Sequence, residues 1–206
     1  KNLTTLGEGG MLTVKENKFS NIIPMLRHNG HCEFDFEKEK YWKPTMSNVD
    51  MPELNGKFLF PNNYCLGEVE CALGSKLLKR LDQMNQDKRY RAIYFIDQLS
   101  EFKELIFHRV NSKRHNYHLL VAQITEGKRD DFIQMMAEEQ KIQCVVQYYP
   151  LYRYKLYQKA GLGFASCENT DELYDNMISF PFHHMMIESD FQYLLNSTKI
   201  VLNKLR

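Results

Sequence analysis

The sequence has few glycines and prolines and no long run of apolar residues. Ten glycines and six prolines among 206 residues leave little chain for long flexible linkers. No window approaches the roughly 18 uninterrupted apolar residues that a membrane-spanning helix requires. A basic start followed by an apolar core, which marks a secretory signal, is not found either. We therefore expect mostly regular elements and no membrane partner.

Neither sign of charge is in excess. Lysine and arginine number 27 and aspartate and glutamate 26, which gives a formal net charge of +1. Nucleic-acid-binding proteins normally carry a basic excess on one face, so this balance argues against a nucleic-acid partner. Hydrophobic residues make up 43% of the chain and charged residues 26%, which is typical of a folded globular protein.

Cysteines are scattered and do not form a C-x-x-C pair. Their odd number predicts free thiols in a reducing compartment, and we expect a cytoplasmic protein. A zinc site needs ligands clustered at short spacing, which neither these cysteines nor the histidines provide, so we predict no metal site. The five cysteines are Cys32, Cys65, Cys71, Cys144 and Cys167.

The first half of the chain contains one dominant pattern. Apolar side chains recur at helical spacing from Gly67 to Leu99, which predicts a helical segment of about 50 Å if it is unbroken. Such a segment is long enough to cross a domain boundary. Before it, we expect a short strand at residues 11–14 and a helix over residues 19–26 that Pro24 shortens and Gly30 ends.

The second half alternates between strand and helix patterns. Strands are predicted at residues 117–124, 144–149 and 177–180, and helices over residues 130–140 and from about residue 188. This order predicts an α+β or α/β unit of about 100 residues.

Two turns could hold a ligand or could be purely structural. The Gly7-Glu8-Gly9-Gly10 turn is a tight turn or part of a site, but it is not a P-loop, because no Gly-Lys-Ser/Thr opens a helix after it. The polar turn at residues 62–68 is either a helix cap or an anion site at a helix start.

Two further segments carry side chains suited to substrate binding. Four tyrosines within residues 147–154 either pack or line a sugar or nucleotide pocket, where phenols stack and donate hydrogen bonds. The adjacent His183 and His184 are either partly buried side chains or functional groups. Serine, histidine and acidic residues do not occur in a recognisable order, so we predict no hydrolytic triad.

Several stretches, taken in order along the whole chain, resemble one enzyme family. Residues 1–11, KNLTTLGEGGM, hold a lysine followed by a small polar stretch and Gly-Glu-Gly-Gly. The other stretches are residues 26–30, residues 63–64 with the helix after them, and residues 118–119, 149–151 and 179–181. Together they resemble the DegT/StrS-type nucleotide-sugar aminotransferases, which use pyridoxal phosphate.

The resemblance implies an α/β fold, namely the C-terminal half of a fold type I pyridoxal-phosphate transferase that opens at its Schiff-base lysine. Residues 1–66 would be the C-terminal part of the large cofactor-binding domain, including the end of its sheet. Residues 67–104 would be the long connecting helical segment, and residues 105–206 a small C-terminal α/β (α+β) domain. The rest of the cofactor site would lie in the half of the fold that the chain lacks.

The resemblance also implies residue roles. Lys1 would form the Schiff base with pyridoxal 5'-phosphate and, once freed, move the proton between the two carbons of the substrate imine. Asn63 would contact the cofactor phosphate of the partner subunit in a homodimer. Tyr148, Tyr149 and His183 are the candidates for binding the acceptor, a keto-sugar that the resemblance suggests is nucleotide-linked. The amino donor would be glutamate or glutamine, and the reaction would belong to amino-sugar biosynthesis.

The sequence departs from the family pattern at two positions. Cys65 stands where the family usually has arginine, and Gln147 where many members have histidine. These changes leave a cyclitol or another keto-sugar open as the acceptor. The alternative to an enzyme is a catalytically silent half-protein that dimerises or binds a partner.

Overall fold

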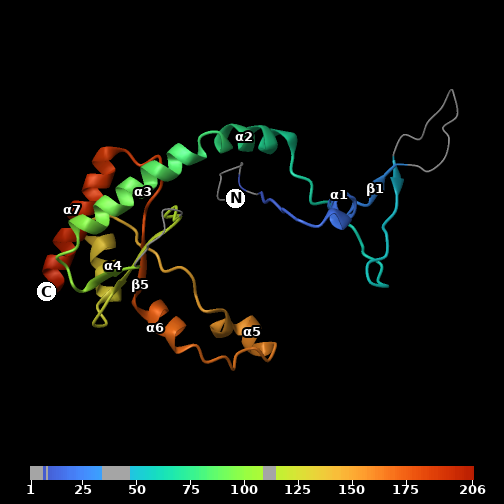
Figure 1. The fold of residues 1–206 in the computed structure, drawn as a ribbon. Coiled ribbons are helices and arrows are strands. Elements are labelled where there is room, and N and C mark those ends of the chain that lie inside the picture. Colours follow the sequence, from blue (N-terminus) through green and yellow to red (C-terminus); the bar gives the residue numbers. More distant parts are fainter. Residues whose placement is uncertain (1–6, 8, 34–46, 109–114) are drawn as a thin grey trace. The chain divides into compact units, whose positions relative to one another are not determined.

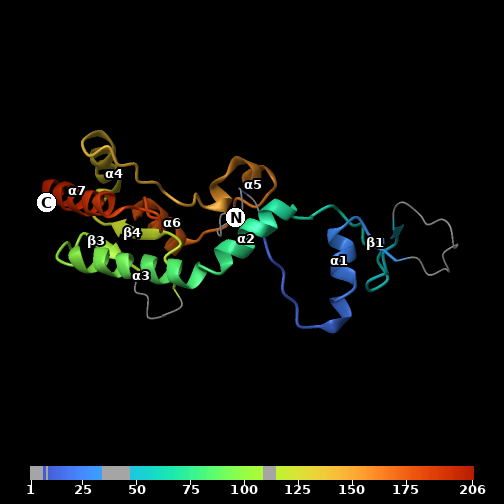
Figure 2. The ribbon, with the colours of Figure 1, turned by 90° about the horizontal axis from the view of Figure 1, so that it is seen from above.

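The computed structural model describes residues 7, 9–33, 47–108 and 115–206. The chain forms two compact units, the first from Lys1 to Lys79 and the second from Arg80 to Arg206. Each unit is described by itself, and Figures 1 and 2 show their elements from two directions. The division between the units falls inside the helical segment expected over residues 67–104.

The first unit is built from short elements. Helix α1 ends where the backbone turns left-handed at Asn29 and Gly30, and the Gly30 N–H donates to the Met25 carbonyl at 2.7 Å. Pro24 is the third residue of α1, a position whose N–H would have no partner inside the helix, so it fits without a kink. The elements are η1 (Asn17–Phe19), α1 (Ile22–Arg27), β1 (His31–Cys32), β2 (Asn48–Val49) and α2 (Glu68–Leu78).

The strand predicted at residues 11–14 is wrong. These residues adopt no regular structure, and Met11 and Leu12 are largely exposed. A strand needs a neighbour to receive its backbone hydrogen bonds, and among the described residues none pairs with this stretch. The only ladder of the unit lies elsewhere in its described part, where His31 of β1 pairs antiparallel with Val49 of β2.

The long helical segment is two helices rather than one. Helix α2 ends at Leu78 and α3 begins at Leu81, with Lys79 and Arg80 as a turn between them. The burial of the two helices differs, because α3 places Ala92 and Phe95 in a core whereas α2 has no buried residue. Because packing of an apolar face supplies most of a helix's stability in a protein, only α3 has strong tertiary support.

The second unit is a three-stranded sheet with helices packed around it. The sheet order is β3-β4-β5 with both pairs antiparallel, and Ala122 at its centre pairs with Phe107 on one side and Ile178 on the other. Its elements are α3 (Leu81–Gln98), β3 (Leu105–Phe107), β4 (Leu120–Ile124), α4 (Arg129–Glu138), η2 (Leu151–Arg153), α5 (Lys155–Lys159), α6 (Glu168–Asn176), β5 (Met177–Phe180) and α7 (Glu188–Leu205).

Aromatic rings hold this core together. Phe95 of α3 lies 5.1 Å from Phe180 of β5 and 6.1 Å from Phe191 of α7, measured between ring centroids. Phe132 of α4 meets Phe180 edge-to-face at 6.1 Å. All four rings are at most 4% exposed. One strand and three helices therefore share a single contact point.

The strand predicted at residues 144–149 is also wrong. Only Val145 joins the sheet, through a two-bond bridge to Ser179 at the outer side of β5. Pro150 has no N–H to donate, and the chain leaves the sheet after the bridge. Cys144 beside it is 5% exposed, and this burial raises the pKa of its thiol to about 12.

The described residues contain neither a membrane-spanning helix nor a cluster of metal ligands. No helix there has the length and apolarity needed to cross a membrane. No group of three or more histidine, cysteine, aspartate or glutamate residues is placed to hold a metal ion in that part of the chain. All five cysteines are free thiols, as their spacing predicts.

Candidate functional site

The sequence-predicted lysine lies outside the described residues. Lys1 and most of the stretch after it belong to residues 1–6 and 8, and the described chain begins with Gly7, Gly9 and Gly10. Gly7 has φ +118°, a conformation that other residues rarely adopt. The structure therefore describes the three glycines of this turn, but not Lys1, which was predicted to bind the cofactor.

Asn63 forms an isolated backbone bridge with His28, just after the end of α1. The Asn62 N–H donates to the Leu26 carbonyl at 3.1 Å, and the Tyr64 N–H donates to the Arg27 carbonyl at 2.8 Å. These bonds fix the position of the Asn63 backbone, which bridges His28.

The Asn63 side chain is exposed and makes one hydrogen bond. Its Oδ1 accepts the Cys65 N–H at 3.0 Å, which leaves the two Nδ2 hydrogens without a partner among the described residues. The turn is not a side-chain cap of α2, because the N-cap is Gly67 and no side-chain capping bond is present. Asn63 therefore presents amide donors to solvent from a fixed backbone.

A cavity of about 670 Å³ lies in the first unit. Its wall is formed partly by the end of the glycine-rich turn with the residues after it, and partly by the residues that follow Asn63. Both segments belong to stretches that carry the family resemblance. Its only charged lining residue among those described is Arg27, so its polar part suits an anionic group. The lining residues are Gly9, Gly10, Met11, Leu12, Ile23, Leu26, Arg27, Tyr64, Cys65 and Leu66.

In the second unit, the tyrosine-rich segment both packs and remains accessible. Tyr148 is 70% exposed and Tyr149 is 39% exposed. The Tyr149 ring meets Tyr154 edge-to-face at 4.9 Å and Tyr174 of α6 at 5.4 Å between centroids. Tyr149 therefore has fixed neighbours while part of its ring faces solvent.

A charged network that the sequence did not reveal lies under these rings. Asp171 of α6 accepts a hydrogen bond from the Tyr152 hydroxyl at 2.6 Å and forms an ion pair with the Arg153 guanidinium. The same guanidinium also contacts the Asp175 carboxylate at 3.4 Å. The Arg153 guanidinium lies over the Tyr174 ring, 5.3 Å from its centroid. Hydrogen bonding to Asp171 raises the pKa of Tyr152 to about 12, and the same bond, together with Arg153, lowers the pKa of Asp171.

His183 is exposed on the turn after β5, and its neighbour His184 is partly buried. Burial lowers the pKa of His184, and the charges of His183, Lys88 and Arg80 lower it further. Burial also lowers the pKa of Lys88, whose ammonium lies 5.8 Å from the centroid of the Phe182 ring. The charges that act on this turn therefore include the cations Lys88 and Arg80 and the opposing carboxylate of Asp87.

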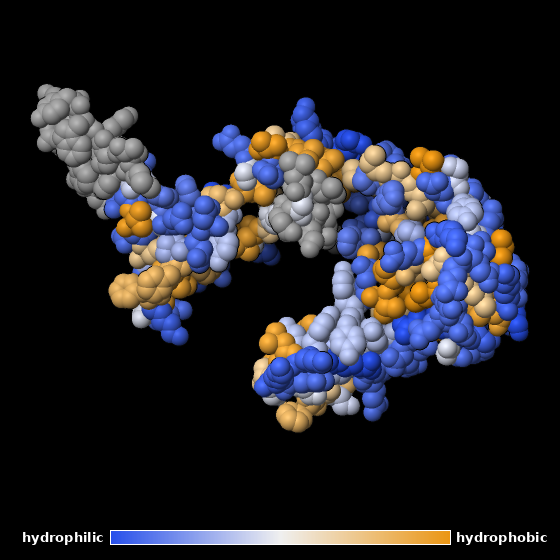
Figure 3. Space-filling model, turned by 180° about the vertical axis from the view of Figure 1, so that it is seen from behind, coloured by the Kyte–Doolittle hydropathy of each residue, from blue (hydrophilic) through white to orange (hydrophobic). Residues whose placement is uncertain are grey.

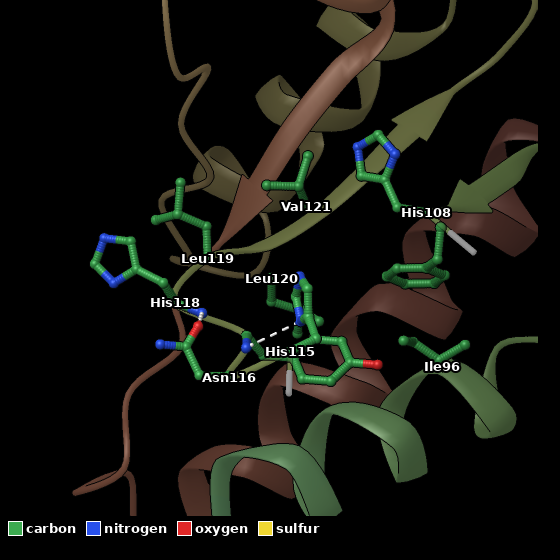
Figure 4. Close-up of a pocket in the computed structure, with 10 residues that line it drawn as sticks. Ile96, His108, His115, Asn116, His118, Leu119, Leu120 and Val121 are labelled. Atoms are coloured by element: carbon green, nitrogen blue, oxygen red, sulfur yellow. Dashed lines mark hydrogen bonds between the residues drawn. The ribbon is translucent and has the colours of Figure 1, made fainter. Parts of the chain in front are cut away.

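A second cavity, of about 240 Å³, lies where β3 ends and β4 begins, and α3 contributes Ile96 to its wall. His115 Nδ1 accepts a hydrogen bond from the Tyr117 N–H at 3.1 Å. Figure 4 shows His115 among the residues that line this cavity. Burial lowers the pKa of His115, with Arg89 and His108 acting in the same direction, so its imidazole favours the neutral form. None of the predicted site residues that the structure describes (Asn63, Tyr148, Tyr149 and His183) lines this cavity.

Comparison with known proteins decides which family this arrangement belongs to. The model of the DegT/DnrJ/EryC1/StrS aminotransferase family matches residues 1–199. The chain belongs to this family. The match confirms the resemblance inferred from the lysine, glycine and asparagine motifs.

The chain is also similar to individual aminotransferases in sequence or in fold. A UDP-4-amino-4,6-dideoxy-N-acetyl-beta-L-altrosamine transaminase of Campylobacter jejuni is 28% identical over 212 residues, covering all of this chain and 51% of that protein. An aminotransferase from Psychrobacter cryohalolentis superposes with a TM-score of 0.81 at 17% identity, over 99% of this chain and 54% of that one. The putative sugar aminotransferase Spr1654 from Streptococcus pneumoniae, in its PMP-form, gives 0.75 at 16% identity, over 94% of this chain and 47% of that one.

Two conclusions follow for the DegT/DnrJ/EryC1/StrS chain. The mixed α/β fold expected for part of a fold type I aminotransferase is confirmed. The chain spans about half the length of the curated relatives that it matches.

Proposed function

We propose that this chain provides part of the active site of a pyridoxal-phosphate-dependent sugar aminotransferase. The reaction transfers an amino group from glutamate or glutamine to a keto-sugar carried on a nucleotide, in amino-sugar biosynthesis. The observation that carries the proposal is the cavity of the first unit, because it joins the chain after the glycine-rich turn to the chain after Asn63 in a member of this family.

The described residues fit the cofactor at its phosphate end. A phosphate requires hydrogen-bond donors and positive charge, and Asn63 has two amide hydrogens without a partner among the described residues. Arg27 adds a cation at the cavity wall. The PMP-form of the Streptococcus pneumoniae protein supports the same cofactor class.

Each residue has a distinct task in this proposal. Pyridoxal phosphate, when bound, supplies the electron sink on which the amino group is carried between substrates. The Lys1 amine would hold the cofactor at the cofactor's aldehyde carbon and, once released, would take up and return the proton that moves during amino transfer. Asn63 donates its amide hydrogens to the cofactor phosphate of the partner subunit.

The acceptor sugar is assigned to the second unit. Tyr148 and Tyr149 offer partly exposed phenol rings, and His183 offers an exposed imidazole on a turn whose neighbours include the cations Lys88 and Arg80. A UDP-sugar appears in the name of the Campylobacter jejuni relative, which supports a nucleotide-linked acceptor.

The surface of the chain supports an assembly with further protein. Apolar side chains lie on the visible surface in the space-filling view, and Met11, Phe60 and Phe164 are each at least 87% exposed. Apolar side chains that are exposed in one chain become buried when further protein packs on them. The active form in this proposal is a homodimer in which the rest of the family fold accompanies this chain.

The experiment that tests the proposal substitutes Lys1 by arginine in the complete enzyme. Arginine keeps the positive charge, but its guanidinium is not deprotonated and cannot attack an aldehyde, so Lys1→Arg should abolish both transamination and the yellow absorbance of lysine-bound cofactor. Lys15→Arg, an exposed lysine of the same unit, is the matched control and should retain both.

Two outcomes would count against the proposal. Yellow absorbance that persists in Lys1→Arg would remove Lys1 from its assigned role. If the complete protein never binds the cofactor but still dimerises, the alternative of a catalytically silent protein that dimerises would be favoured.

A further inference from the structure

The contacts around Asp171 form a continuous path from α6 to Tyr149. Asp171 binds Arg153, and Arg153 lies over the face of Tyr174. Tyr174 in turn meets the Tyr149 ring edge-to-face at 5.4 Å, while Tyr154 contacts the same ring at 4.9 Å. Tyr149 is therefore held between two rings, and one of these rings is covered by a guanidinium that Asp171 fixes.

Backbone pairing does not provide this order. In the described part of this segment, Val145 is the last residue that pairs with the sheet. Farther along, the backbone bonds that Arg153 and Tyr154 donate are local, to the carbonyls of Pro150 and Leu151. The position of the segment therefore depends on side chains that reach α6.

Asp171 is the residue on which most of these contacts converge. It accepts the Tyr152 hydroxyl at 2.6 Å and pairs with Arg153, so it holds two consecutive residues of the segment at once. Asp175 contributes a single, longer contact of 3.4 Å to Arg153. Charge-assisted hydrogen bonds are the stronger ones, and two on one carboxylate fix its partners relative to each other.

We propose that Asp171 is a positioning residue for acceptor binding, which holds the segment of Tyr152 and Arg153 so that Tyr149 presents its ring to the keto-sugar. This inference rests on the proposed function, because it assigns Tyr149 to the acceptor. Asp171 does not touch the substrate itself. Its effect passes through Arg153 and Tyr174. Asp171 therefore affects binding of the acceptor sugar and not of the amino donor, which has no sugar to contact these rings.

The test measures the two half-reactions of the complete enzyme separately. Asp171→Asn keeps the size of the side chain and removes the negative charge, so Arg153 loses its closer ion pair and keeps only the longer contact to Asp175. The KM for the keto-sugar should rise about three- to tenfold while kcat stays within about twofold. The rate with glutamate in the other half-reaction should also stay within about twofold of wild type. A general structural defect would lower both half-reactions together.

Matched variants separate the carboxylate from its surroundings. Glu172→Gln neutralises the next residue of the same helix, whose side chain is exposed, and should leave both half-reactions unchanged. Asp171→Glu restores a carboxylate and should recover most of the acceptor affinity. If Asp171→Asn does not fold, Tyr152→Phe removes one of the two bonds and should raise the acceptor KM about threefold.

Each outcome has a defined meaning. A wild-type enzyme that turns over neither substrate overturns the proposed function itself. An active wild type in which Asp171→Asn leaves the acceptor KM unchanged, or lowers both half-reactions equally, overturns the positioning role alone.

Discussion

At the scale of single residues, the hydrogen bond between Tyr152 and Asp171 shifts two pKa values in opposite directions. The bond requires a protonated phenol and an ionised carboxylate, so it raises the pKa of Tyr152 to about 12 and lowers that of Asp171. Both side chains keep some exposure to solvent, and the pair therefore titrates without being deeply buried. Its contribution to stability must vary with pH.

The sign of this variation can be worked out for Tyr152. Its pKa rises from 10.0 in the unfolded chain to about 12 in the folded one, so its stabilising effect is fully present below pH 10 and is lost as the pH rises through 12. We predict that wild type has a higher free energy of unfolding than Tyr152→Phe, and that the difference between them is largest below pH 10. The gap should narrow between pH 10 and 12. Urea unfolding at several pH values measures it.

The control for this prediction removes the acceptor of the hydrogen bond. In an Asp171→Asn background, the same Tyr152→Phe substitution should give a gap that no longer narrows over this pH range. A gap that narrows equally in both backgrounds would show that another group causes the pH dependence.

The residue scale also shows where sequence reasoning ends. Lys1 and Asn63 could be proposed because each belongs to a contiguous motif of the family. Asp171 and Tyr174 could not, since neither has a motif and they meet Tyr152 and Arg153 only after folding brings α6 to them. Helical spacing does place Asp171 and Asp175 on one face of α6, but spacing alone does not identify the residue that this face contacts.

At the scale of elements, α3 is the helix most directly tested by a single substitution. Phe95 is fully buried, and its ring contacts Phe107, Phe180 and Phe191 within 6.2 Å between centroids. These rings belong to β3, β5 and α7, so removing Phe95 leaves a cavity bordered by three elements. We predict that Phe95→Ala lowers the free energy of unfolding by about 3–5 kcal/mol, measured by urea unfolding.

An exposed aromatic on the same helix provides the comparison. Tyr90 is 73% exposed, and Tyr90→Ala should change the free energy of unfolding by no more than about 0.5 kcal/mol. Equal losses in the two variants would mean that the Phe95 cluster does not carry the stability of this unit.

Prediction from sequence succeeded for elements whose own apolar pattern decides their structure. Strand β5 matches the expected residues 177–180, β4 lies within the expected strand, and helices α4 and α7 lie within two residues of the positions expected from their patterns. It failed where a partner decides. Residues 144–149 have a strand-like composition, but only Val145 finds a partner, and the three-residue β3 was missed because its pairing with β4 is what defines it.

At the scale of the whole molecule, the chain carries two assigned regions in two units. The cavity next to Asn63 belongs to the first unit, and the tyrosines and His183 belong to the second. In the proposed enzyme both serve one reaction, the first through the cofactor and the second through the acceptor. The family match over residues 1–199 spans both units, which supports a common role.

The final prediction concerns how subunits share a site. In the proposed homodimer, Lys1 and Asn63 serve one cofactor from different chains. Complete Lys1→Ala enzyme should be inactive. Complete Asn63→Ala enzyme should be weakened by the loss of a charge-assisted phosphate contact worth about 1.5–3 kcal/mol. When the two variants are mixed and allowed to exchange subunits, one site of each mixed dimer collects both lesions and the other collects neither.

Activity should therefore reappear after mixing, with one wild-type-like site for every mixed dimer. The measurement compares the rate after subunit exchange with the mean of the two parent rates. The control is the same mixture assayed before the subunits have had time to exchange. If Asn63 instead serves the site of its own chain, every site in the mixture carries one lesion or the other. The rate would then never exceed the mean of the parents, and the shared site would be disproved while Lys1 could still hold the cofactor.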